Sequence, residues 1–90
     1  MVYVSVKQSV EDYNIWRPFF DNDAPRRMTG GATGVNHVYR DAEKPNEVTV
    51  ILEWDSKENA HKFTTDPALR EVMQKAGVVG MPSVAILNRS

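Results

Sequence analysis

Residues 34–76 decide the fold of this chain: GVNHVYRDAEKPNEVTVILEWDSKENAHKFTTDPALREVMQKA. The stretch opens with two strand patterns, at 35–40 and 47–54, which a polar turn at 41–46 separates. One face of the second strand is apolar at every other position: Val48, Val50, Leu52 and Trp54. This spacing of two predicts a strand with one buried face. Ile51 lies on the opposite face, which indicates that this face is partly covered as well.

Two helix patterns follow this hairpin. Asp55 and Glu58 have the spacing of a capping box, so a helix is expected from residue 55 or 56 to about residue 64. A second helix is expected to begin at Asp66-Pro67, because Asp caps helix N-termini and Pro suits the first helical position. Gly77 is expected to end it. The helices are expected to bury one apolar stripe: Ala60, Phe63, Leu69, Val72, Met73 and Ala76.

The chain before residue 34 predicts one strand and one helix. Valines alternate with other residues over 2–7, the pattern of a strand, and Ser9 is expected to cap the helix that follows. Pro18 removes a backbone donor within that helix and is expected to kink it. Pro25 and the glycine-rich run at 29–31 are expected to end the segment. The apolar stripe of this helix is Val10, Tyr13, Trp16, Phe19 and Phe20.

With a last strand at 84–87, the order is β-α-β-β-α-β. It predicts one α+β domain over residues 1–90, with a ferredoxin-like four-stranded antiparallel sheet and its helices on one face. The other sheet face would be open although it carries apolar residues. A chain of 90 residues without cysteine buries little surface and has no disulfide to compensate. We therefore expect a homodimer in which a second copy covers the open face, as in a dimeric α+β barrel.

Composition excludes several classes of function. The net charge is −1 and no stretch concentrates Lys or Arg, so nucleic acid is not an expected partner. No segment approaches the roughly 20 apolar residues that span a bilayer, and the N-terminus lacks a signal-peptide pattern. We expect a soluble, cytoplasmic protein without membrane contact. His37 and His61 are the only histidines, at no recognised ligand spacing, so no metal is expected.

The run 46–56 and the residues after it also resemble a known family. The run reads NEVTVILEWDS, and Ala60, Phe63, Asp66-Pro67 and Leu69-Arg70 follow it. This pattern resembles the antibiotic biosynthesis monooxygenase-like branch of the dimeric α+β barrel superfamily. The resemblance implies two ferredoxin-like protomers paired through their sheets, each with a pocket between sheet and helices. It implies activities such as cofactor-free oxidation of polycyclic phenols, polyketide cyclisation, lactone isomerisation or haem degradation.

Haem degradation is the least expected of these activities. The haem-degrading relatives carry a helix tryptophan, an iron-binding histidine and a first-strand asparagine. The corresponding positions of this chain hold Phe63, Met73 and Ser5 or a neighbour. We therefore expect no bound cofactor.

His37 is the candidate catalytic residue. It lies in mid-strand on the same face as Val35 and Tyr39, and imidazole titrates near neutral pH, which suits a general base. The structural alternative is a strand histidine hydrogen-bonded at the sheet face or dimer seam. The candidate ligand-binding residues are aromatic, as the wall of a flat ligand requires: Tyr13, Trp16, Phe20, Tyr39 and Trp54. The alternative for these is core packing.

Three functions stay open from sequence. The first is a small enzyme, a cofactor-free monooxygenase or cyclase acting on an aromatic or polyketide-like substrate. The second is a non-catalytic dimer that binds a small hydrophobic metabolite. The third is a structural or stress-related dimer with a filled core. A cavity beside His37 would separate the first two from the third.

Overall fold

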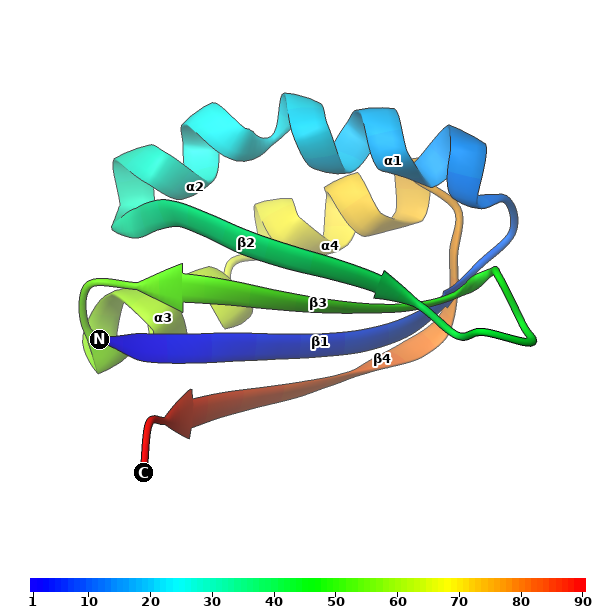
Figure 1. The fold of residues 1–90 in the computed structure, drawn as a ribbon. Helices are drawn as coiled ribbons and strands as arrows, with labels where there is room; N and C mark the ends of the chain where they lie inside the picture. The colour runs from blue at the N-terminus through cyan, green and yellow to red at the C-terminus, as the bar shows by residue number, and fades with distance from the viewer.

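A four-stranded antiparallel sheet with helices on one side makes up the fold (Figure 1). The computed structural model describes the whole chain, residues 1–90. The sheet order is β2-β3-β1-β4, which confirms the predicted ferredoxin-like arrangement. No helix is long and apolar enough to cross a membrane. The elements are β1 (Val2–Val10), α1 (Tyr13–Asn22), α2 (Ala24–Gly30), β2 (Ala32–Arg40), β3 (Glu47–Trp54), α3 (Lys57–Thr64), α4 (Pro67–Lys75) and β4 (Val78–Asn88).

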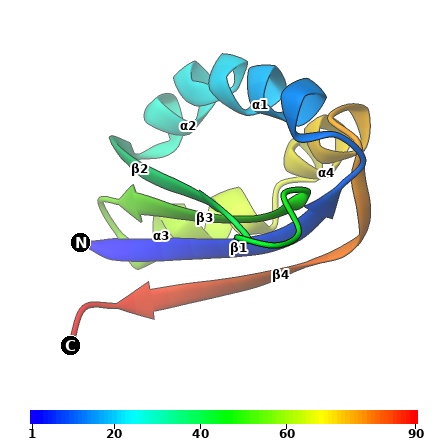
Figure 2. The ribbon, with the colours of Figure 1, turned by 45° about the vertical axis from the view of Figure 1, so that its right-hand side comes forward.

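The two central strands, β1 and β3, supply most of the core. Val4 pairs with Leu52 and Val6 with Val50, so these four buried side chains point to the same face of the sheet. The helices cover one face of the sheet (Figure 2). Burying each such side chain stabilises the fold by about 1.5–3 kcal/mol. We call this the inner face and the opposite one the open face. The predicted apolar face of β3 is confirmed, since all four of its side chains are at most 2% exposed.

The first strand is longer than predicted, and Ser9 does not cap a helix. Ser9 lies in β1, and its hydroxyl donates to the Glu47 carboxylate on β3. The helix begins after Asp12, whose side chain accepts a hydrogen bond from the Asn14 amide at 2.9 Å. Ser9 lies in the strand and not at a helix start because the strand has to continue to Val10, which is 4% exposed and belongs to the core. Asp12, three positions further on, caps the helix equally well.

The expected single helix after β1 is two helices. α1 runs through Pro18 to Asn22, and the kink expected there stays a prediction. The break lies at Asp23, because Pro25 has no N–H for the carbonyl of Asp21. Pro25 does not end the segment as predicted. It lies in the first turn of α2, where a missing donor costs nothing.

The second half follows the prediction closely. Ser56 caps α3 and Asp66 caps α4, with Pro67 at the first helical position. β4 begins at Val78, six residues before the predicted start at 84. The pairing of β4 with β1 shifts register between Lys7 and Ser9, and this shift accommodates Gly80, Met81 and Pro82 within the strand. Glycine and proline are uncommon inside strands, which is why the predicted strand began only after them.

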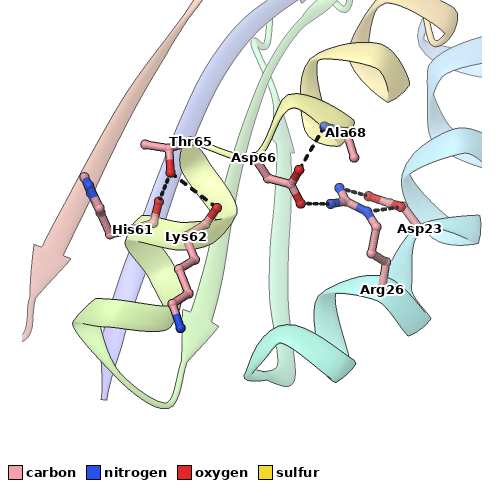
Figure 3. Close-up of polar contacts among 7 residues, drawn as sticks. All are labelled: Asp23, Arg26, His61, Lys62, Thr65, Asp66 and Ala68. Atoms are coloured by element: carbon pink, nitrogen blue, oxygen red, sulfur yellow. Dashed lines mark hydrogen bonds and ion pairs between the residues drawn. The ribbon is translucent and has the colours of Figure 1, made fainter.

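An arginine on α2 joins this helix to the start of α4 (Figure 3). Arg26 on α2 donates to both carboxylate oxygens of Asp23, at 2.9 and 2.8 Å. It also donates to Asp66 at 3.2 Å, while the other oxygen of Asp66 accepts from the Ala68 amide. α2 is thereby tied to the start of α4.

Candidate functional site

A small cavity lies between the inner sheet face and the helices. Its volume is about 40 Å³, and ten of its thirteen lining residues are hydrophobic. Val6 and Val50 line it from the sheet, and Leu69 and Met73 line it from α4. The three remaining lining residues are polar: Gln8, Asp23 and Arg27. An apolar cavity with a few convergent polar groups is the usual form of a small-molecule site.

Two of the predicted aromatic residues form a wall of this cavity. Trp16 and Phe20 stack with ring centroids 5.1 Å apart, and both line the cavity. They lie one turn apart on α1, so the helix presents both rings to the sheet. Tyr13 packs against Trp16 at 5.8 Å without lining the cavity, and the Arg40 guanidinium covers its ring at 3.8 Å.

Trp54 is a core residue. It is 1% exposed and packs against Phe63 on α3 with ring centroids 4.7 Å apart. It does not line the cavity. Trp54 borders a separate surface pocket of about 290 Å³ between α2 and α3 instead. The indole N–H is buried and donates to no protein group.

His37 and Tyr39 lie on the open face. Their strand partners are Ile51 and Thr49, which alternate with the buried residues of β3. Both side chains are exposed, and their rings stack at 6.2 Å. The sequence-based hypothesis made His37 the base of a site walled by Tyr13, Trp16 and Phe20. The structure separates them by the thickness of the sheet, because β2 pairs with β3 in the register that turns His37 away from the helices.

The sequence interpretation missed Gln8 and Arg27. Gln8 is 6% exposed and its amide oxygen accepts no hydrogen bond from any protein group. Arg27 is 4% exposed and forms no ion pair within 4.0 Å. One guanidinium nitrogen, Nη1, donates to the Phe20 carbonyl at 2.9 Å, and the group lies 4.1 Å above the Phe20 ring. Burial lowers the pKa of Arg27, and the Asp23 carboxylate partly opposes this change.

Patterns in the sequence do point to these residues. Gln8 occupies an inward position of β1, between Val6 and Val10, where alternation predicts an apolar side chain. Arg27 follows Trp16 by eleven residues and Phe20 by seven, which is helical spacing along one face. Trp16, Phe20 and Arg27 share a helical face only if the helical segment continues past Pro25, which was predicted to end it.

Fold and cavity together define a ferredoxin-like α+β protein with a cavity between its sheet and its helices. No family model matches the sequence, and no curated protein matches it. Solved structures do match over almost the whole chain. A candidate antibiotic biosynthesis monooxygenase from Bordetella bronchiseptica has a TM-score of 0.79 at 16% identity, over 99% of this chain and 96% of that one.

Two further structures show the same likeness. SnoaB, a cofactor-independent oxygenase from Streptomyces nogalater, has a TM-score of 0.77 at 13% identity, over 99% of this chain and 92% of SnoaB. A conserved protein from Methanosarcina mazei Go1 has a TM-score of 0.75 at 15% identity, again over 99% and 92%. Identities this low show a shared fold. The expected resemblance to antibiotic biosynthesis monooxygenase-like proteins is thus confirmed for the fold.

Proposed function

We propose that this protein binds an aromatic or polyketide-like molecule in the cavity and oxidises or cyclises it without a bound cofactor. The observation that carries the proposal is the apolar cavity with its stacked Trp16 and Phe20 wall. SnoaB, named as a cofactor-independent oxygenase, supports it through the shared fold. Fold alone does not set chemistry, so the site must carry the claim.

Ligand entry requires the cavity to grow. A volume of about 40 Å³ accommodates a few water molecules, whereas benzene binding has been seen at about 150 Å³. α1, α2 and α4 are the elements suited to move, because each has only one buried side chain: Trp16, Arg27 and Leu69. Elements with few buried contacts open at low free-energy cost. We therefore infer that one or more of these helices moves outward from the sheet when a ligand binds.

A non-catalytic binder is the second candidate, and one observation favours it. The only carboxylate lining the cavity is Asp23, and Arg26 occupies both of its oxygens. No His, Lys, Tyr or Glu side chain lines the cavity. A general base must reach the proton that it removes. Catalysis thus requires either release of Asp23 or a substrate acidic enough to enter as its anion.

Adjacent phenylalanines give a matched test of the site. Phe20 lines the cavity, while Phe19 points away and is 37% exposed. We expect Phe20→Ala to weaken binding of a polycyclic phenol about tenfold, since one buried aromatic contact contributes about 1.4 kcal/mol or more. Phe19→Ala should change affinity less than twofold. Fluorescence titration with such phenols measures this, and equal effects of the two variants would exclude the cavity as the site.

Oxygen consumption then separates the functions. A dissolved-oxygen electrode should show uptake with a bound phenol if the protein is an oxygenase, and product without uptake if it is a cyclase. Binding without product supports the non-catalytic candidate. His37→Ala tests the sequence-based prediction that His37 is the base. Because His37 lies across the sheet from the cavity, we expect unchanged turnover. Lost turnover with retained affinity would restore His37 as the base.

We also propose that the protein forms a homodimer through the open face. Only 15 of 90 residues are buried in one protomer, which is a small core. Ile51 lies at the centre of the open face, flanked by Ser5 of β1 and His37 of β2. Tyr39 and Leu87 add apolar surface there, at 57% and 44% exposure. A second copy would bury this surface.

The dimer predicts a melting temperature that rises with protein concentration. For two chains of this length, a hundredfold increase should raise it by about 5–10 °C, from the unfolding entropy per residue. Ile51→Asp should abolish the dependence, because it places a charge in the shared interface. Ile15→Asp is the control, since Ile15 is 57% exposed on α1. A wild-type melting point that ignores dilution would contradict the dimer.

A further inference from the structure

Arg27 carries a buried positive charge that no carboxylate neutralises directly. Its neighbour Arg26 contacts two carboxylates, Asp23 and Asp66, although Arg26 is the less buried of the two. Arg27 is 4% exposed and has only the Phe20 carbonyl and ring as partners. A guanidinium has five N–H donors, and this one uses a single donor in a protein hydrogen bond. Its other nitrogens have no protein partner and are not fully buried, so they are free to bind a ligand oxygen.

Gln8 adds a second unpaired polar group to the same cavity. It pairs with Val48 on β3, so its side chain points to the inner face. The amide oxygen is buried and accepts no hydrogen bond from the protein, which costs about 1–3 kcal/mol. A leucine at this position would pack in the core without that cost. One cationic donor and one acceptor therefore converge on a cavity that is otherwise almost entirely apolar.

We infer that the ligand of this cavity is a ring-bearing monoanion, whose charged oxygen binds Arg27 and whose separate hydroxyl donates to the Gln8 oxygen. The inference rests on the proposed function and specifies its substrate class. A single negative charge is required because Arg27 is the only cation in the lining, and Asp23 would repel a second charge. The ten hydrophobic lining residues require that the rest of the ligand be apolar.

Arginine suits this task better than lysine. Its planar guanidinium donates two parallel hydrogen bonds to a carboxylate or to vicinal oxygens, and it keeps its charge when buried. The Phe20 ring beneath it holds the guanidinium plane in place. When the ligand binds, the Arg27 guanidinium forms an ion pair with it in a largely water-free site. The protein should therefore bind the deprotonated form of the ligand more tightly than the protonated form.

Three one-ring probes test the inference by NMR titration at pH 7: 3-hydroxybenzoate, benzoate and benzyl alcohol. We expect the wild-type protein to bind 3-hydroxybenzoate at least tenfold more tightly than benzyl alcohol, with benzoate between them. Arg27→Met should remove the preference for anions and leave benzyl alcohol within threefold. Gln8→Leu should remove only the preference for 3-hydroxybenzoate over benzoate. The Arg27 Nε–H resonance should shift with both anions and not with the alcohol.

Arg26→Met is the matched control. It removes the neighbouring guanidinium, which does not line the cavity, and should keep the preference for anions. Equal binding of all three probes, or an unchanged preference in Arg27→Met, would overturn the inference while leaving cavity binding intact. If no probe binds, and only water hydrogen-bonds to Gln8 and Arg27, both the proposed ligand-binding function and this inference are overturned. Replacing a largely buried charge by an apolar side chain of similar size is often neutral for stability, so Arg27→Met should fold, and Gln8→Leu gives an independent test.

Discussion

Trp54→Ala is expected to lower the free energy of unfolding by about 3–5 kcal/mol, the usual cost of truncating a buried aromatic residue. Trp54 is among the most deeply buried large side chains and packs against Phe63. Gly30 lies beneath its six-membered ring, where a Cβ would be 3.5 Å from Cζ3. Domains of this size have about 5–15 kcal/mol in total, so this variant should be marginally folded. Urea unfolding measures the change, with Trp16 as the remaining fluorophore.

Trp54→Phe is the control for this prediction. The indole N–H is buried without an acceptor, so removing it relieves an unfavourable term. The phenyl ring keeps most of the contact with Phe63. The loss should therefore stay below about 1.5 kcal/mol. A loss as large as that of Trp54→Ala would show that the indole N–H has a partner that matters for folding.

Gly31→Ala should cost about 2–3 kcal/mol, the second large effect. Gly31 ends α2 with φ of +119°, a conformation that side chains disfavour. A Cβ there would lie 2.7 Å from the Asp55 carboxylate and 2.8 Å from the Asn59 amide nitrogen. These two side chains hydrogen-bond each other at 2.9 Å, so the methyl group would separate them. Thermal and urea unfolding of the variant give the cost.

Gly80→Ala separates backbone strain from crowding. Gly80 also has a positive φ, +73°, but nothing lies within 4 Å of the position of its Cβ. This variant should lose only about 1 kcal/mol, from strain alone. The difference between the two glycine variants then measures the disturbance of Asp55 and Asn59. Equal losses would mean that those side chains move aside at no cost.

β3 and the starts of α3 and α4 were predictable because they depend on local chemistry. Asp66 followed by Pro67 caps α4 through its own side chain, whatever the rest of the molecule does. β3 alternates over eight residues, and such alternation places every second side chain in the core. The first half was harder to predict, because Pro25 is compatible both with the end of one helix and with the first turn of another.

Sequence alone determined the order of the strands, the inward face of the central strands and the cap of α4. Only the tertiary structure decided which residues share a site. Alternation showed that His37 and Tyr39 lie on one face, but pairing with Ile51 and Thr49 turned that face away from the helices. Arg27 became a cavity residue because α2 folds over the sheet. Periodicity orders side chains within one element, whereas a site depends on how separate elements pack.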